Sequence, residues 1–184
     1  MQAFKASSFT STRSVAFSSS YAPSQRRCCL RIMANTGDQW KENLITKDED
    51  IVQLARSAKR VAVLGIKTEK KAETPAFFVA EFLQKAGVKI VPVPIFFPEC
   101  TEILGEKVFR RVQDVPESQE LDIVDVFRKP SDIPAHMEDL LAAKPKAVWF
   151  QSGIRNDECA EHLARAGIKV VQDKCLKVEY GIQR

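Results

Sequence analysis

From residue 58 onward the sequence predicts an α/β fold built on a five-stranded parallel sheet with helices on both faces. Two observations support this prediction. Five short runs rich in β-branched residues alternate with segments of helical length. The runs are largely apolar, which is typical of strands buried on both faces and joined by right-handed crossovers. The predicted fold is therefore Rossmann-like, with one domain over residues 58–184.

The first 37 residues have the composition of an organelle transit peptide. They contain no Asp or Glu, five basic residues and eight serines, and the apolar residues among them are scattered. A secretory signal would need an uninterrupted apolar segment, whereas an acid-free, hydroxyl-rich segment is typical of import into an organelle. We therefore expect residues 1–37 to be a transit peptide and linker, with a processing site near Ile32-Met33-Ala34. The chloroplast is the favoured destination and the mitochondrion is the alternative.

Residues 38–57 are expected to form the rest of the linker and one short helix. Thr46 and Glu49 have the spacing of a capping box, in which the two side chains satisfy the first amides of a helix. Ile51, Leu54 and Ala55 then recur at helical spacing. This pattern predicts a helix that packs one face on the domain without joining the sheet.

The five strands and the helices between them follow in regular order. Strands are predicted at residues 61–65, 88–93, 121–127, 147–150 and 168–173, and helices at 75–87, 133–143 and 156–167. Numbered along the chain, we expect the strands to lie side by side in the order 3-2-1-4-5. In such sheets, ligands bind beyond the carboxyl ends of the strands, near the point where the order reverses.

Charge and composition argue against several classes of partner. Removing residues 1–33 takes away the basic excess and leaves 23 basic residues against 24 acidic ones. No cationic face with interleaved aromatic residues remains, so nucleic-acid binding is disfavoured. No stretch approaches the length of an apolar membrane span. Cys100, Cys159 and Cys175 have spacings that fit no zinc motif, so no metal site is expected.

The loop after the first strand predicts anion binding without the dinucleotide fingerprint. This loop has one glycine, Gly65, where G-x-G-x-x-G has three. Gly65 can still form a tight turn, and Pro75 suits the first position of a helix whose N-terminus favours phosphate. Ile66 and Lys67 follow Gly65, and Lys67 can neutralise a phosphate or lie on a solvated surface.

Other candidate ligand residues follow the later strands. The second strand ends Pro92-Val93-Pro94-Ile95, an apolar edge suited to an adenine or a pantetheine arm. Arg128 follows the third strand directly, where its guanidinium can grip a phosphate or pair with Asp125 or a loop carboxylate. Gln151-Ser152-Gly153 follows the fourth strand. The two histidines, His136 and His162, fall in predicted helices away from the strand ends, so no catalytic set is expected.

Taken together, these segments resemble the small stand-alone CoA-binding protein family, which shares the fold of the CoA-binding domain of succinyl-CoA synthetase α subunits. The resemblance spans about residues 48–179 and is carried by RVAVLG, FLQKAG-VKIVPV, LDIVDVFRKP, AVWFQSG and QDKC. The combination of VDVFR, W-x-Q-x-G and D-x-C is the most specific part. Two regions depart from the family pattern: the first βα region, with Gly65-Ile66-Lys67 and Thr74-Pro75-Ala76, and the end of the second strand, with Pro94-Ile95. These departures imply either rearranged phosphate contacts, with Lys67 as a substitute, or the loss of CoA binding.

The resemblance implies a ligand, CoA or acyl-CoA, and a set of contacts. Together with the strand-end loops, it gives eight expected ligand residues: Gly65, Ile66, Lys67, Pro92, Phe127, Arg128, Gln151 and Gly153. The ligase's phosphorylated histidine and second domain have no counterpart.

The leading hypothesis is a non-catalytic CoA carrier, sensor or CoA-presenting module of an organelle, with a small-molecule ligand, no nucleic acid and no membrane. Three alternatives stay open: an acyl-CoA-dependent enzyme subunit that needs a partner, an NAD(P)-binding redox protein, and an interaction module with an empty crevice. Cys100 and Cys175 lie near strand ends, where either thiol is expected to approach a CoA thiol.

Overall fold

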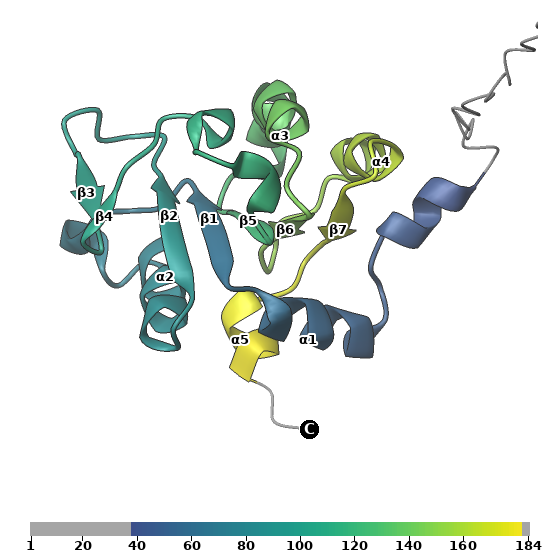
Figure 1. Ribbon diagram of the computed structural model, residues 1–184, viewed down its shortest axis with the longest axis horizontal. Helices are drawn as coiled ribbons and strands as arrows, with labels where there is room; N and C mark the ends of the chain where they lie inside the picture. The colour runs from purple at the N-terminus through teal and green to yellow at the C-terminus, as the bar shows by residue number, and fades with distance from the viewer. Residues whose placement is uncertain (1–37, 182–184) are drawn as a thin grey trace, which may run out of the picture. The chain divides into compact units, whose positions relative to one another are not determined.

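A five-stranded parallel sheet forms the centre of the fold. The computed structural model describes residues 38–181 and is shown in Figure 1. The strands are β1 (Arg60–Leu64), β2 (Lys89–Val93), β5 (Ile123–Val126), β6 (Ala147–Phe150) and β7 (Lys169–Val171). All four pairings between neighbouring strands are parallel, which confirms the predicted fold class.

The predicted strand order, 3-2-1-4-5, is wrong. The sheet runs β2-β1-β5-β6-β7, which is 2-1-3-4-5 when its strands are numbered along the chain. β1 pairs with β2 on one side and with β5 on the other, with Val61 opposite both Ile90 and Ile123. Pro92 explains why β2 is an edge, because its carbonyl points away from β1 and accepts from the Phe109 amide, 2.9 Å away. A proline has no N–H to offer a further strand on that side.

Helices cover both faces of the sheet, as expected. α1 (Asp48–Ser57), α2 (Pro75–Lys85) and α5 (Leu176–Gly181) lie on one face, and α3 (Met137–Ala143) and α4 (Asp157–Arg165) lie on the other (Figure 1). Successive strand residues point to opposite faces, so Val61 and Val63 pack toward α1 and α2, whereas Ala62 and Leu64 pack toward α3 and α4. This alternation makes two apolar cores, one on each side of the sheet.

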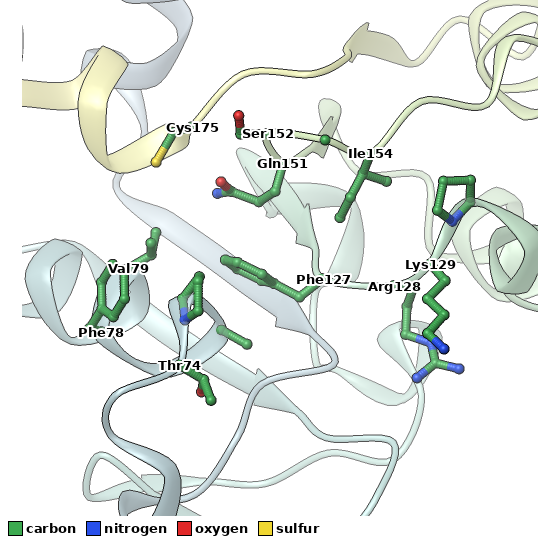
Figure 2. A pocket seen from close by; sticks show the side chains of 14 residues that line it. Thr74, Phe78, Val79, Phe127, Arg128, Lys129, Gln151, Ser152, Ile154 and Cys175 are labelled. Atoms are coloured by element: carbon green, nitrogen blue, oxygen red, sulfur yellow. The ribbon is translucent and has the colours of Figure 1, made fainter.

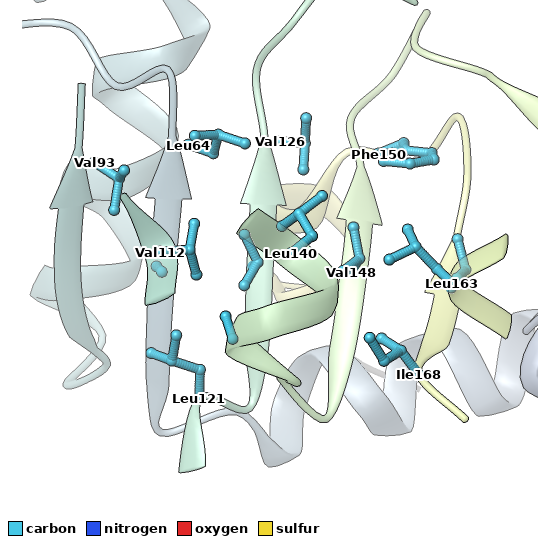
Figure 3. Close-up of a cluster of buried hydrophobic side chains, with 14 of the residues drawn as sticks. Leu64, Val93, Val112, Leu121, Val126, Leu140, Val148, Phe150, Leu163 and Ile168 are labelled. Atoms are coloured by element: carbon cyan, nitrogen blue, oxygen red, sulfur yellow. The ribbon is translucent and has the colours of Figure 1, made fainter. Parts of the chain in front are cut away.

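The core beneath α3 and α4 shows how the strands and helices interlock. Leu64, Val126 and Phe150 from three neighbouring strands meet Leu140 and Leu163 from the two helices (Figure 3). All five side chains are at most 1% exposed. Burial of this kind, at about 25 cal/mol per Å² of apolar surface, is the main stabilising contribution to such a domain.

The segment before β1 differs from the prediction in two ways. α1 is present, but the predicted capping box is not: Lys47 is the N-cap residue, and no side chain caps the helix. Instead, three acidic residues in the first turn face the positive end of the helix dipole. The expected linker is also packed, because the 3-10 helix η1 (Gln39–Asn43) contacts α4 through Asn43, whose side chain donates to the Ala164 carbonyl at 2.9 Å. The predicted transit peptide, residues 1–37, lies outside the described residues.

Several elements were not predicted from the sequence. Between β2 and β5 the chain forms the antiparallel pair β3 (Glu102–Ile103) and β4 (Glu106–Lys107), followed by the 3-10 helices η3 (Val112–Asp114) and η4 (Ser118–Glu120). The predicted helix over 133–143 is divided into the 3-10 helix η5 (Pro130–His136) and α3, with Pro134 inside η5. None of the helices in residues 38–181 is long and apolar enough to cross a membrane.

Candidate functional site

The loop after β1 is held tightly against the loop after β5. Gly65 has a φ of +91°, and a Cβ at this position would lie 2.7 Å from the backbone oxygen of Phe127. The Gly65 amide donates to the Val93 carbonyl at 2.8 Å, and the Phe127 amide donates to Leu64 at 2.9 Å. Only glycine therefore fits here, both for its backbone conformation and for its space.

A pocket of about 510 Å³ lies beside this junction, beyond the carboxyl ends of β5 and β6 and next to the start of α2 (Figure 2). It is lined by Thr74, Pro75, Ala76, Phe78, Val79, Phe127, Arg128, Lys129, Pro130, Gln151, Ser152, Gly153, Ile154 and Cys175. Most of its wall is apolar, and the polar groups are few. This combination is typical of small-molecule sites.

Of the eight expected ligand residues, four line the pocket: Phe127, Arg128, Gln151 and Gly153. The other four lie outside its wall. Gly65 holds the neighbouring loop, and Ile66, which is 1% exposed, packs in the core under α1 and α2. Pro92 is buried within β2, and Lys67 lies over the Phe96 ring, with its Nζ 4.6 Å from the ring centroid. The side chains of Ile66 and Pro92 are thus directed into the protein interior.

Arg128 is an anchored cation at the mouth of the pocket. Its Nη2 donates to Asp132 at 2.8 Å, so the predicted pairing with a loop carboxylate is made by Asp132 and not by Asp125. The Arg128 side chain is only 16% exposed, and its buried Nε has no hydrogen-bond partner in the described part of the chain. This donor is an exception, because buried polar groups are paired in almost every protein.

The N-terminus of α2 adds a second anion-attracting feature to the pocket. Pro75 is the first residue of the helix, and the Thr74 hydroxyl donates to the Lys71 carbonyl at 2.7 Å rather than capping the helix. Thr74, Pro75 and Ala76 all line the pocket. The positive end of the α2 dipole is therefore directed at the space where a ligand would lie.

Gln151 and Asp125 form a buried polar pair beneath the pocket. Gln151 Nε2 lies 2.9 Å from each carboxyl oxygen of Asp125. Asp125 is fully buried and Gln151 is 4% exposed. Burial raises the pKa of the Asp125 carboxyl to about 8, although the Gln151 hydrogen bonds act in the opposite direction. The sequence placed Asp125 on a strand but gave no indication of this partner.

The loops after β6 and β7 are tied together at the other end of the pocket. The Gly153 amide donates to Asp173 Oδ1 at 2.6 Å, and the Trp149 indole donates to the Lys174 carbonyl at 2.7 Å. These bonds place Cys175 in the pocket wall. Cys100 lies elsewhere, with its thiol donating to the Glu102 carbonyl at 3.0 Å. The sequence predicted no role for Asp173, although this residue is the first of the D-x-C motif.

The lining residues do not form a nucleophile-and-base pair. Ser152 is in the wall, but neither His136 nor His162 lines the pocket. His136 lies in η5, nearer the site than expected: burial and the positive charge of Arg128 lower its pKa, with Asp139 and Asp132 acting against them. Within residues 38–181, no group of three His, Cys, Asp or Glu side chains is arranged to hold a metal ion.

Comparison with known proteins places the chain among relatives of similar sequence and fold. A family model described as a CoA binding domain matches residues 59–181. The uncharacterized protein YneT of Bacillus subtilis is 29% identical over 135 residues, covering 73% of this chain and 95% of YneT. A solved Thermus thermophilus protein, cell-free ID.343, is 36% identical with a TM-score of 0.65, covering 73% of this chain and 97% of that one. A dinucleotide-forming acetyl-coenzyme A synthetase from Ca. Korarchaeum cryptofilum is similar in fold alone, at 20% identity and a TM-score of 0.50, with 61% and 25% of the two chains covered.

Proposed function

Because the chain belongs to the CoA-binding domain family, we propose that its pocket binds CoA or an acyl-CoA and catalyses no reaction on its own. The protein then acts as a carrier, a sensor or a module that presents CoA to a partner. The observation that supports this most directly is that the pocket has a mostly apolar wall and a positively charged side chain, Arg128, at its mouth. The apolar part suits a pantetheine arm, and the mouth suits phosphates.

Two features of the mouth suit the phosphates of this ligand. The partly exposed Arg128 guanidinium offers a charge-assisted hydrogen bond, and the α2 N-terminus offers a favourable dipole. Lys67 and Arg128 lie over the same ring, with Arg128 Cζ 5.7 Å from the Phe96 centroid. Lys67 is thus close enough to the mouth to contribute charge to a bound phosphate, although it is outside the pocket wall.

Calorimetric titration with CoA and with NAD tests the proposal. We expect CoA to bind in preference to NAD, because the first loop lacks the dinucleotide fingerprint. Arg128→Ala is expected to weaken CoA binding about ten- to a hundredfold, through the loss of a charge-assisted contact worth roughly 1.5–3 kcal/mol. Arg56→Ala is the matched control, since Arg56 is exposed in the last turn of α1. Equal affinity for CoA and NAD, or an Arg128→Ala variant that binds CoA normally, would contradict the proposal.

We also propose that the protein works in a plastid, on the basis of the acid-free, serine-rich segment before Ala34. Removal of that segment would follow import. N-terminal sequencing of the protein from isolated chloroplasts is expected to begin near Ala34. A chain that still begins at Met1 or Gln2 in chloroplast extracts would overturn this part of the proposal.

A further inference from the structure

The polar pair beneath the pocket has no role in the binding scheme above. Asp125 lies opposite Val63 of β1 and Trp149 of β6, so its side chain points to the same face of the sheet as theirs. That face is the apolar core covered by α1, α2 and α5. An acidic side chain in such a place costs free energy, and it needs a compensating interaction.

Gln151 provides that interaction, and its own orientation is fixed as a result. Gln151 Nε2 lies 2.9 Å from each carboxyl oxygen of Asp125, so it donates to the carboxylate or, when the carboxyl is protonated, to its carbonyl oxygen; no other hydrogen bond to this carboxyl is made within residues 38–181. The nitrogen end of the amide therefore points down into the core. Gln151 also lines the pocket, so its oxygen is the end left for a ligand, and no described residue donates to it.

We propose that Asp125 is a positioning residue that fixes Gln151 so that its carbonyl oxygen Oε1 faces the pocket and accepts an N–H group of the ligand. The inference depends on the proposed function and deepens it by naming the part of the ligand that is recognised. The pantetheine arm of CoA carries two secondary amides, each with one N–H. A site with a buried acceptor discriminates against ligands that leave the acceptor unpaired.

The arrangement of the pocket assigns this acceptor to the pantetheine arm rather than to the adenine. Figure 2 shows the Arg128 guanidinium and the Cys175 sulfur on opposite sides of the pocket, with Gln151 on the Cys175 side. Phosphates held near Arg128 leave the arm to run along Phe127 and Ile154 toward Cys175. Gln151 lies on that path, whereas Phe96 and Lys67 lie outside the pocket wall.

The experiment uses CoA, pantetheine and adenosine 3′,5′-bisphosphate as separate calorimetric probes, the last two being fragments of the first. Gln151→Leu is expected to weaken binding of CoA and pantetheine about tenfold and to leave the bisphosphate unchanged. Gln53→Leu, the same substitution at an exposed position of α1 outside the pocket wall, is the control and is expected to bind all three as the wild type does. Loss of bisphosphate affinity in Gln151→Leu, or unchanged pantetheine affinity, would overturn the inference.

Variants of Asp125 test the positioning role separately. Asp125→Asn keeps an oxygen that accepts from Gln151 and is expected to bind pantetheine within about threefold of the wild type. Asp125→Leu removes the acceptor and frees the amide, so it is expected to lose about tenfold toward pantetheine and nothing toward the bisphosphate. If Asp125→Leu unfolds, Asp125→Asn and Gln151→Leu still decide the outcome. Wild-type protein that ignores CoA would refute the proposed function, whereas CoA binding that is indifferent to Gln151 would refute this inference alone.

Discussion

At the scale of single residues, Asp125 shows how burial and hydrogen bonding act against each other. The carboxyl is removed from water by β1, β6 and the helices above them, and one amide is its only hydrogen-bond partner among the described residues. Burial raises its pKa to about 8, compared with about 4 in an unfolded chain. The group is therefore protonated in the folded protein over a pH range in which the unfolded chain has released the proton.

This difference predicts how stability depends on pH. Because the folded state binds one more proton between about pH 4 and pH 8, the free energy of unfolding falls as the pH rises through that interval, by at most about 1.4 kcal/mol per pH unit. Above about pH 8 this contribution is lost. Asp125→Asn removes the titrating group, so its free energy of unfolding is expected to fall less between pH 5 and pH 8. Urea denaturation at several pH values measures both proteins, and identical pH profiles would refute the assignment.

The two glycines of the site are expected to respond differently to substitution. Both have positive φ, +91° at Gly65 and +77° at Gly153, but only at Gly65 would a Cβ meet backbone, the Phe127 oxygen at 2.7 Å. Gly153→Ala is expected to cost about 1–2 kcal/mol, for the left-handed conformation alone. Gly65→Ala is expected to cost more, because the loop after β5 must also shift. Chemical denaturation compares the two, and an equal loss would show that the close contact does not matter.

At the scale of elements, the site depends on how the loops after β6 and β7 are held. Asp173 accepts from the Gly153 amide, and its own amide donates to the Ile154 carbonyl at 3.2 Å. Asp173 has a φ of +56°, a conformation that Asp and Asn tolerate better than most residues. This residue therefore joins two loops whose strands are neighbours in the sheet.

Replacing Asp173 is expected to loosen this end of the pocket. Asp173→Ala loses the side-chain acceptor and places alanine at positive φ. Because the lost hydrogen bond is exposed and contributes little, the two effects together are expected to lower the free energy of unfolding by roughly 1–2 kcal/mol. Asp173→Asn keeps an acceptor and is the matched control. Hydrogen exchange of the Gly153 amide is expected to accelerate in the alanine variant and to stay near the wild-type rate in the asparagine variant. Equal protection in the two variants would mean that the bond is dispensable.

At the scale of the whole molecule, the pocket joins elements that are far apart in the sequence. α2, the loop after β5, the loop after β6 and the loop between β7 and α5 each contribute to its wall. A ligand bound there contacts the folded state and not the unfolded chain. Binding is therefore expected to raise the stability of the domain as a unit.

The proposed ligand should produce a measurable thermal shift. At a hundredfold excess over its dissociation constant, CoA is expected to add about 2.7 kcal/mol to the free energy of unfolding. For a domain of this size that corresponds to roughly 5–11 °C in Tm. NAD at the same concentration is expected to shift Tm much less. Scanning calorimetry with each ligand measures the difference, and a Tm indifferent to CoA would contradict the proposed function.

Much of the fold follows from local patterns in the sequence. The largely apolar runs that became β1, β2, β5, β6 and β7 predicted strands buried on both faces, and the segments of helical length between them predicted α2 and α4. These patterns are local because the buried side chains of each strand or helix recur at a spacing that can be recognised within about ten residues. The family resemblance also followed from the sequence, since VDVFR and W-x-Q-x-G are contiguous motifs.

The tertiary structure alone decided the order of the strands and the composition of the pocket. Strand order depends on which strand edges pair across long loops. Pro92 prevents further strand pairing on one edge of β2, but the sequence does not show which edge; the structure does, because the Pro92 carbonyl faces away from β1. The position of Asp125 under Gln151 likewise depends on the β5–β6 register, in which residues 26 positions apart come within 2.9 Å. The sequence by itself determined which segments are strands and helices and which family they compose, because those properties depend on near neighbours. Which side chains face one another across the pocket was left to tertiary packing, because pairings between distant segments carry no periodic signal along the chain.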